Sequence, residues 1–303
     1  MAMRRDAVTV IGAATSAGTH HAGQERAPDA LRAAGLIERL VRAGITVTDH
    51  GNVARERFRV DAGHRGARNL AATVRAAQAV ADAVESAAGE GSLLLVLGGD
   101  CTITLGALAG LQRVEPATGL AYFDGDADLG TPDAGSGILD AMGIAHLLGL
   151  AETELTGLFR SRPPLAEQRL AMLGYDETDP ESYRRSVFDA RPGLTRYPDH
   201  AVREDPVGCA RGALAALGEA EPLIVHFDVD AVDSGDLPLA NFPHYGTGVP
   251  LAVAGQVLSV LFAAPSLSAV VLTEVNPSYD PSGDSLDRYL EAVTGALITG
   301  LAG

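Results

Sequence analysis

The stretch Ala121-Tyr122-Phe123-Asp124-Gly125-Asp126-Ala127-Asp128 ends an apolar run and places three carboxylates at alternate positions. If residues 119–123 form a strand, Asp124, Asp126 and Asp128 start out on one side of it. Carboxylates this close repel one another, and burying them costs several kcal/mol each unless a cation lies among them. The stretch therefore indicates either a cation site or a solvated turn in which aspartates cap backbone groups.

A second Asp-x-Asp pair favours the cation site. Asp228 and Asp230 directly follow the apolar run of residues 223–227, just as the first set follows residues 119–123. Either pair alone is weak evidence, because aspartate caps helices and turns freely. Two such pairs at the ends of two predicted strands favour carboxylates that share a metal ion.

Apolar runs alternate with helical patterns along the chain. The predicted strands are residues 8–11, 45–48, 93–97, 119–123, 170–174, 195–197, 223–227 and 269–272. The predicted helices are residues 27–40, 67–88, 102–111, 139–150, 152–159, 200–217, 251–262 and 284–301. This alternation predicts an α/β fold with a mostly parallel sheet and helices on both faces. No linker or repeat interrupts it, so we expect a single domain over residues 1–303.

Polar residues follow four of the predicted strands directly. Besides the two aspartate sets, Cys101 follows residues 93–97 after a Gly-Gly-Asp turn, and Glu274 follows residues 269–272. In open parallel sheets, ligands bind at the carboxyl ends of the strands. The sequence therefore predicts that these four clusters converge at one edge of the sheet.

The composition and charge of the chain limit the classes of binding partner that we expect. The chain has 303 residues, 47% of them hydrophobic, and a formal net charge of −16. This acidity argues against nucleic acid or an anionic membrane as a partner and mildly favours a cationic small-molecule substrate. Its two cysteines lie far apart and imply no disulfide framework. With no signal peptide and no run long enough to span a bilayer, we expect a cytoplasmic protein.

The candidate ligands suit a pair of divalent metals. Paired metals lower the pKa of a bridging water and polarise a substrate. An oxygen-dominated set suits Mn²⁺ or Mg²⁺, whereas the thiolate of Cys101 would shift the preference toward Zn²⁺ or Fe²⁺. A single occupied position remains an alternative. The candidate ligands are Cys101, Asp124, Asp126, Asp128, Asp228 and Asp230.

Four motifs resemble those of the ureohydrolases, the family of arginase, agmatinase and formimidoylglutamase. Leu97-Gly98-Gly99-Asp100 resembles the family's Gly-Gly-Asp-His motif, and residues 123–132 resemble its Asp-Ala-His-x-Asp segment. Residues 226–233 are similar to its Ser-x-Asp-x-Asp-x-x-Asp-Pro motif, and Glu274-Val275-Asn276-Pro277 matches its Glu-x-Asn-Pro. The resemblance covers nearly the whole chain. It implies a three-layer α/β/α domain with a roughly eight-stranded sheet, a dinuclear manganese site and a homo-oligomer, usually a trimer or hexamer.

The resemblance also implies roles for individual residues. It assigns Cys101, Asp124, Asp128 and Asp228 to one metal and Asp124, Asp126, Asp228 and Asp230 to the other. Asp128 would accept a hydrogen bond from a metal-bridging hydroxide, and Glu274 would pair with the substrate guanidinium. The hydroxide would attack the guanidinium carbon, and the tetrahedral intermediate would collapse to urea, or a substituted urea, and an amine.

Three positions depart from the family pattern. Cys101 and Asp126 stand where the family has a histidine ligand at each metal, and Asp140 stands where its proton-shuttling histidine is expected. Replacing neutral imidazoles by anions should weaken the Lewis acidity of the metals. An aspartate at position 140 could still transfer protons, although its unperturbed pKa of about 3.9 suits the task less well.

Substrate contacts are predicted at four residues. Gly130 replaces the asparagine with which arginase contacts the substrate carboxylate, while Thr131 and Ser136 remain. Asp179 lies in a segment that resembles the arginase loop at the substrate's amino end, together with Asp176, Glu177 and Glu181. A solvated helix start is the alternative for that segment. His244 lies in a loop that could overhang the site and replace the lost shuttle; an exposed loop histidine is the alternative.

Two function classes follow. One is a metal-dependent hydrolase of linear C–N bonds in a guanidino compound or a modified relative such as an N-hydroxyguanidine. A less basic substrate of this kind would depend less on the missing histidine as a general acid. The other is a catalytically inactive metal- or ligand-binding protein, or a partner subunit of a true ureohydrolase. Against the second, the retained aspartates and Glu274 are costly to bury without a cation.

Overall fold

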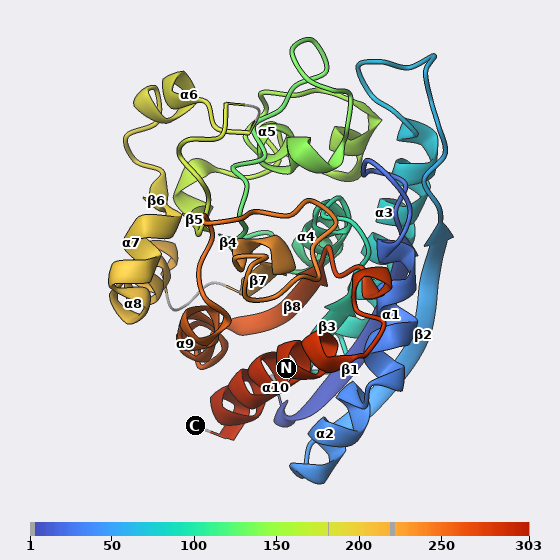
Figure 1. Ribbon diagram of the computed structural model, residues 1–303, viewed down its shortest axis with the longest axis vertical. Coiled ribbons are helices and arrows are strands. Elements are labelled where there is room, and N and C mark those ends of the chain that lie inside the picture. Colours follow the sequence, from blue (N-terminus) through green and yellow to red (C-terminus); the bar gives the residue numbers. More distant parts are fainter. Residues whose placement is uncertain (1–3, 181, 219–221, 303) are drawn as a thin grey trace.

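Eight parallel strands form one sheet in the computed structural model, which describes residues 4–180, 182–218 and 222–302 (Figure 1). The strands are β1 (Arg4–Thr15), β2 (Thr46–Glu56), β3 (Ser92–Leu97), β4 (Gly119–Phe123), β5 (Leu170–Leu173), β6 (Thr195–Tyr197), β7 (Leu223–Asp228) and β8 (Leu267–Thr273). Their order across the sheet is β2-β1-β3-β8-β7-β4-β5-β6, and every neighbouring pair is parallel.

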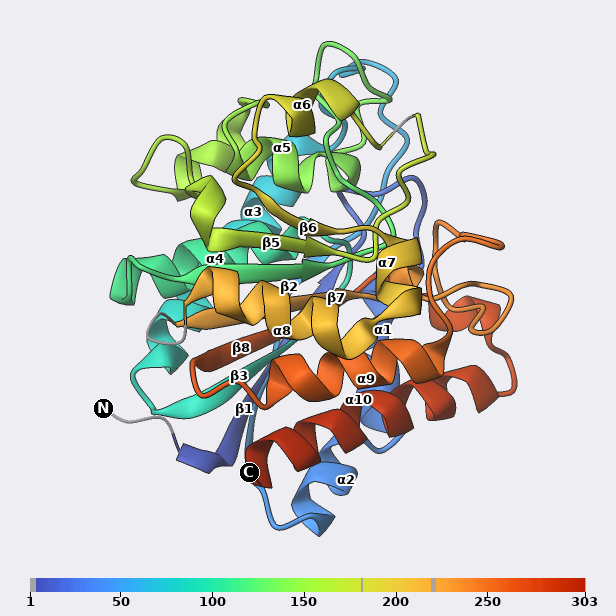
Figure 2. The same cartoon turned by 90° about the vertical axis from the view of Figure 1, so that its left-hand side faces the viewer.

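Helices cover both faces of the sheet (Figures 1 and 2). They are α1 (Ala27–Ala33), α2 (Leu36–Arg42), α3 (Leu70–Ala88), α4 (Ile103–Val114), α5 (Gly143–Leu147), α6 (Arg185–Asp189), α7 (Asp199–Glu204), α8 (Pro206–Leu217), α9 (Leu251–Phe262) and α10 (Asp284–Ala302). Short 3₁₀ turns are η1 (Gln24–Arg26), η2 (Asp140–Met142), η3 (Glu154–Leu158), η4 (Glu167–Arg169), η5 (Val229–Ala231) and η6 (Pro277–Tyr279).

The hydrophobic core is divided into two layers by the sheet. Successive side chains of a strand point to opposite faces. Thus Leu93, Leu95 and Leu97 of β3 belong to the core layer that also contains α1, α2, α8, α9 and α10, whereas Leu94 and Val96 belong to the layer that contains α3, α4 and α5. A strand that is apolar on both faces belongs inside a covered parallel sheet, and β3 lies between β1 and β8. The prediction of a three-layer α/β/α fold is confirmed.

Several predicted helices are shorter or broken. Residues 27–40 form two helices, because Gly35 adopts a left-handed backbone with φ of +91° between α1 and α2. Residues 200–217 are interrupted at Asp205, since the residue before a proline disfavours helical geometry and Pro206 starts α8. The predicted helices 139–150 and 152–159 reduce to η2 with α5 and to η3.

Because all strands run the same way, their carboxyl ends lie at one edge of the sheet. Asp124 follows β4, Asp228 ends β7, Glu274 follows β8, and Cys101 lies in the turn between β3 and α4. These strands occupy the central positions β3-β8-β7-β4. The predicted convergence of the four clusters therefore follows from the topology.

All the described strands join this single sheet, which supports the proposal of one domain over residues 1–303. The predicted strand 8–11 is the central part of the longer strand β1, whereas the predicted strand 45–48 covers only the beginning of β2 and starts one residue before it. Within the described ranges, no helix is both long enough and apolar enough to cross a membrane.

Helices α3 and α4 approach closely at Gly106, where a Cβ atom would lie 2.3 Å from the backbone oxygen of Ala77. Gly106→Ala should therefore lower the free energy of unfolding by about 1–3 kcal/mol through overpacking. Gly295, exposed in α10 with nothing within 4 Å of such an atom, is the matched control. Gly295→Ala should raise stability by about 0.5–1 kcal/mol. Urea unfolding measures both, and a Gly106→Ala variant as stable as the parent would contradict the predicted contact.

Candidate functional site

A cavity of about 410 Å³ opens at the carboxyl edge of the sheet. Most predicted site residues line it: Cys101, Asp124, Asp126, Asp128, Ser136, Asp140, Asp179, Asp228, Asp230 and Glu274. Thr131 and His244, although within the described part of the chain, are not part of the wall. Glu181 lies outside the described residues. The cavity also includes Phe242 and His20, whose rings stack 5.4 Å apart.

The turn after β4 is held by backbone N–H groups. The Asp126 amide donates to Oδ1 of Asp124 at 2.7 Å, and the amides of Ala127 and Asp128 donate to Oγ of Ser182 at 2.5 and 3.1 Å. Ser182 is buried, and sequence reasoning missed it because nothing local marks it. The hydroxyl of Tyr122 donates to Oδ2 of Asp128 at 2.5 Å. These contacts hold the carboxylates at the carboxyl edge of the sheet.

The two Asp-x-Asp pairs are linked to each other. The Gly125 amide donates to Oδ1 of Asp230 at 3.0 Å, and the Asp230 amide donates to Oδ1 of Asp228 at 2.8 Å. One carboxylate oxygen of Asp228 and one of Asp230 thus each accept a hydrogen bond from a backbone amide. The second oxygens of Asp228 and Asp230 are directed toward other side chains, as described below.

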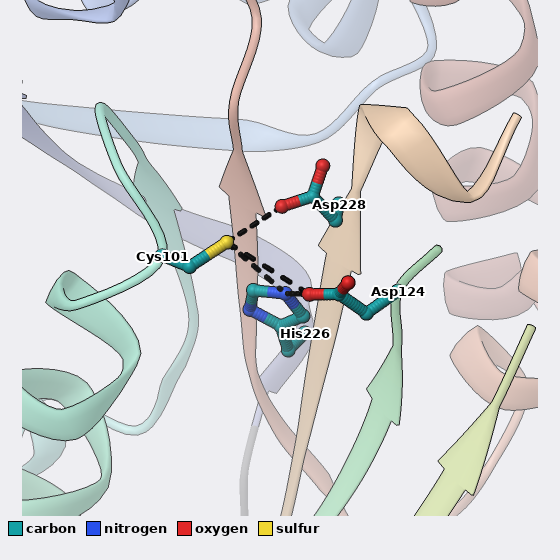
Figure 3. Close-up of side chains that lie close together, drawn as sticks. All are labelled: Cys101, Asp124, His226 and Asp228. Carbon is teal, nitrogen blue, oxygen red and sulfur yellow. Dashed lines mark hydrogen bonds and ion pairs between the residues drawn. The ribbon is translucent and has the colours of Figure 1, made fainter. Parts of the chain in front are cut away.

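Cys101 faces the carboxylates (Figure 3). Its thiol donates to Oδ2 of Asp228 at 2.6 Å, and Sγ lies 3.9 Å from Oδ2 of Asp124. Burial and the nearby charge of Asp228 raise the pKa of the thiol well above its usual range. The Cys101 amide donates to Oδ1 of Asp140 at 2.7 Å. Asp140, at the expected position of the proton-shuttling histidine, thus contacts Cys101, at the expected position of a histidine ligand.

His226 joins the cluster from within β7, and sequence reasoning did not assign it to the site. Its Nε2 lies 3.2 Å from Oδ2 of Asp124 and 3.8 Å from Sγ of Cys101. Its ring stacks on Tyr122, with centroids 4.0 Å apart. Burial lowers the pKa of His226 to about 3, so the imidazole is neutral. The available signal was a single titratable residue inside the apolar run of residues 223–227.

His244, predicted to overhang the site, lies against Asp126 and Asp230. Its Nε2 is 3.6 Å from Oδ2 of Asp126 and 3.9 Å from Oδ2 of Asp230. The side chain is 8% exposed, so the alternative of an exposed loop histidine is wrong. Burial opposes its charged form, but the nearby carboxylates of Asp126 and Asp230 favour it and raise the pKa of His244 to about 9.

Glu274 is held in an unusual backbone conformation. Its φ is +63°, and that of Asp128 is +48°, in a left-handed region that costs residues other than glycine about 1–3 kcal/mol. Oε2 of Glu274 accepts from Nε2 of Gln24 at 2.8 Å. Gln24, fully buried in η1, was not anticipated from sequence. Oε1 has no hydrogen-bond partner among the described residues, which leaves it available to a ligand.

Burial and mutual repulsion raise the pKa of most of these carboxyls. The pKa values of Asp124, Asp128, Asp228 and Glu274 lie well above their usual range. Burial is the main cause in each case, and neighbouring carboxylates add to it. The same effects raise the pKa of Asp230 to about 6 and that of Asp140 to about 8. The cluster therefore attracts positive charge.

Other candidates have structural roles. His146 is buried and bonds the Met142 carbonyl through Nδ1 at 2.7 Å and Thr153 Oγ1 through Nε2 at 2.8 Å. Cys209 is a buried core residue of α8. Asp176 caps its own turn by accepting from the amide and hydroxyl of Thr178, both at 2.7 Å.

The residues present fit divalent cations. Oxygen, sulfur and imidazole nitrogen atoms lie within 4.8 Å of one another in the set Cys101, Asp124, His226 and Asp228 and in the set Asp126, Asp230 and His244. Oδ1 of Asp126 and Nε2 of His244 are buried without a hydrogen-bond partner among the described residues. Unpaired buried polar atoms are costly, and a cation between carboxylates removes both that cost and their repulsion.

The raised pKa values predict how pH affects the cation-stripped protein. A carboxyl whose folded pKa is raised stabilises the fold while protonated, and this contribution is lost as pH rises through the folded value. Between about pH 6.5 and 8.5, the protein in excess EDTA should therefore lose at least about 2–4 °C of melting temperature. Manganese should reduce this loss, because it stabilises ionised carboxylates. Equal melting temperatures in EDTA at both pH values would refute the prediction.

Comparisons with known proteins agree with this geometry. A model of the "Arginase family" matches residues 6–297. An arginase from Bacillus caldovelox is 29% identical over 281 residues, which cover 90% of this chain and 92% of that protein. A crystal structure of arginase from Bacillus subtilis gives a TM-score of 0.83 at 25% identity and covers 98% of this chain and 99% of the other. An arginase from Entamoeba histolytica, solved with L-ornithine, matches in fold with a TM-score of 0.84 over 100% of both chains at 20% identity.

The family match spans most of the chain, and the eight-stranded sheet carries its acidic cluster at the carboxyl edge. This family comprises binuclear metal enzymes, and the cation-compatible clusters of the chain agree with that chemistry. The chain belongs to the arginase family of ureohydrolases and is a metal-dependent hydrolase of guanidino compounds.

Proposed function

We propose that this hydrolase acts on a modified, less basic guanidino compound such as an N-hydroxyguanidine, and that it releases urea or a substituted urea together with an amine. The observation that carries the proposal is the joint position of Cys101, Asp140 and Glu274 on one cavity wall. Residues that differ from the family histidines thus lie beside the carboxylate that would receive the guanidino group. The alternative of a catalytically inactive homologue has no support from the comparisons.

Two divalent cations, most simply manganese, would be held by Cys101, Asp124, Asp126, Asp128, Asp228 and Asp230. When bound, they supply Lewis acidity that polarises the substrate and makes water a better nucleophile at neutral pH. The sulfur of Cys101 favours zinc or iron at its own position, and a single cation remains the alternative occupancy. In either case the bound charge offsets the repulsion among the buried carboxylates.

Glu274 would bind the guanidino group. Its Oε2 is held by Gln24, and its buried Oε1 has no partner among the described residues. A carboxylate oxygen of this kind accepts a strong, charge-assisted hydrogen bond from a guanidino N–H. The left-handed backbone at Glu274 fixes the direction of the side chain, so binding requires little rearrangement.

Asp128 and Asp140 would handle protons. Asp128, whose Oδ2 is held by the hydroxyl of Tyr122, would accept a proton of the attacking water. Asp140, whose pKa burial and neighbouring carboxylates raise to about 8 in the cation-free protein, would donate a proton to the leaving amine. In the net reaction, water adds across the scissile C–N bond: its oxygen goes to the guanidino carbon, and a proton goes to the departing nitrogen.

The remaining predicted contacts would act at the other end of the substrate. Ser136 and Asp179 lie in the cavity wall, which supports contacts with the carboxylate and amino ends of an amino-acid substrate. Thr131 lacks this support and stays a prediction, as does a substrate contact by His244. A homo-oligomer, trimeric or hexameric, also stays a prediction, which light scattering of the purified protein would test.

A substrate screen tests the proposed function. The manganese-loaded protein should release urea or hydroxyurea from N-hydroxyguanidines faster than from the parent guanidines. Glu274→Gln should lower kcat/KM by about 100-fold, because it removes one partner of a buried charged hydrogen bond. Glu291→Gln, the same substitution at an exposed residue of α10, is the matched control. Absence of product from every guanidine, hydroxyguanidine and amidine, with metal bound, would refute the proposal.

Restoring the family residue at position 140 should change substrate preference. In Asp140→His, an imidazole with a pKa near neutrality replaces the carboxyl as general acid and base, and such catalysis contributes about 10²–10⁴-fold. The rate on an unmodified guanidine should rise by at least about 10-fold relative to the N-hydroxyguanidine. Steady-state kinetics on both substrates give this ratio. An unchanged ratio would mean that Asp140 does not determine the preference.

A further inference from the structure

Two histidines lie beside the carboxylate cluster at positions other than those where the family resemblance expects histidine ligands. Those positions hold Cys101 and Asp126. His226 lies inside β7, two residues before Asp228, and His244 lies in the loop between η5 and α9. Each is close to one of the two substituted positions, His226 to Cys101 and His244 to Asp126.

We propose that His226 and His244 supply the imidazole ligands of the two cation positions. His226 completes one set with Cys101, Asp124 and Asp228, and His244 completes the other with Asp126 and Asp230. This inference rests on the dinuclear site of the proposed function and adds its ligands. With cations bound, each position then has a neutral imidazole although neither motif histidine is present, because a cation displaces the proton of His244 on binding.

Figure 3 shows the side chains of the set around His226 directed toward one another, and three of the distances between their ligand atoms are close to those of a four-coordinate site. Bonds of about 2.0–2.3 Å in a tetrahedral site separate ligand atoms by roughly 3.3–3.8 Å. Sγ of Cys101 lies 3.8 Å from Nε2 of His226 and 3.9 Å from Oδ2 of Asp124, and these last two atoms are 3.2 Å apart. The shorter contact of 2.6 Å from Sγ to Asp228 contains the thiol proton, which a cation displaces on binding.

The ring of His226 is oriented for ligation. Its Nδ1 and Oγ1 of Thr104 lie 2.7 Å apart, a hydrogen bond that uses the nitrogen facing away from the cluster. The ring also stacks on Tyr122, with the two planes 9° apart. A hydrogen bond to the outer ring nitrogen is the usual way in which proteins fix a metal-ligating histidine. Nε2 is thereby held toward Cys101 and Asp124.

Two side chains of the second set each have a buried polar atom without a hydrogen-bond partner in the described part of the chain. Nε2 of His244 and Oδ1 of Asp126 have no hydrogen-bond partner among the described residues, and His244 is 8% exposed. Nε2 lies 3.6 and 3.9 Å from the nearest oxygens of Asp126 and Asp230, too far for direct hydrogen bonds but suitable for ligands of one cation. A shared cation would satisfy both side chains.

The two positions would differ in the metals they select. A set with one sulfur and one nitrogen suits zinc, iron or cobalt, whereas two carboxylates with one imidazole suit manganese. His244 would then act as a ligand, in place of the shuttle or substrate contact considered for it. These roles can be distinguished experimentally, because loss of a ligand weakens cation binding even without substrate, whereas loss of a proton shuttle or a substrate contact lowers activity.

Cobalt titration of the full-length, chelator-stripped protein tests the proposal. Cobalt bound to a thiolate gives a charge-transfer band that reports the Cys101 position alone. The wild type should bind two equivalents. His244→Ala should raise the Kd of one cobalt equivalent by at least about 100-fold and retain the thiolate band, because loss of a side chain that only hydrogen-bonds a metal ligand already costs about 10–100-fold in metal affinity. His226→Gln should raise the Kd of the cobalt ion that gives the thiolate charge-transfer band.

A second substitution that restores the histidine expected from the family makes the test more specific. Asp126→His added to His244→Ala should restore the second equivalent, since it returns an imidazole to the same position. His200→Ala, at an exposed histidine of α7, is the matched control and should leave both equivalents unchanged. If the fully buried His226 does not tolerate substitution, hyperfine-shifted imidazole N–H signals of the wild-type cobalt protein count the ligating histidines directly; two are expected.

Two cobalt equivalents with wild-type affinity in His244→Ala and His226→Gln, or no hyperfine-shifted imidazole signal, would overturn the proposal. This outcome is distinct from failure of the proposed function. If the histidine variants lose cobalt as expected but no guanidino compound is hydrolysed, the ligand assignment stands and the substrate assignment falls. If guanidines are hydrolysed while both variants keep their cobalt, only the ligand assignment falls.

Discussion

Repulsion among buried carboxyls is the constraint on which the site depends. Asp124, Asp128, Asp228, Asp230 and Glu274 are each at most 4% exposed and lie around one cavity. Their groups remain together because backbone amides, a tyrosine hydroxyl and a glutamine amide hold them, and because the parallel sheet directs four strand ends to one edge. These contacts position the carboxyls but leave their mutual repulsion, which raises their pKa values. A bound cation would relieve this repulsion and stabilise the folded protein.

Much of the fold could be predicted because buried parallel strands are continuous apolar runs. β3, β4 and β7 were located to within one residue for this reason. The edge strand β2 was predicted too short, since its second half is polar and partly exposed, from Asp49 to Glu56. The helix breaks at Gly35 and Pro206 were visible as residue types, but only the three-dimensional structure shows that the chain turns there instead of continuing.

The site was predictable where its residues directly follow strands, as Asp124, Asp228 and Glu274 do. It was not predictable where side chains arrive from loops or from within a strand. Gln24, Ser182 and His226 carry no local pattern that distinguishes them from ordinary polar residues. Their placement depends on three-dimensional contacts among η1, β7 and the segment before α6. The spacing of residues along the sequence does not show that these segments come together.

The order of the strands also governs when the centre can exist during synthesis. β8 is the last strand made, yet it lies between β3 and β7 and joins the first part of the sheet to the rest. The Gln24–Glu274 hydrogen bond likewise spans 250 positions. A nascent chain lacking β8 therefore has an unpaired edge on each side of the gap and no Glu274. The cavity at the sheet edge therefore cannot be complete until almost the entire chain has been synthesised, since such long-range contacts form late.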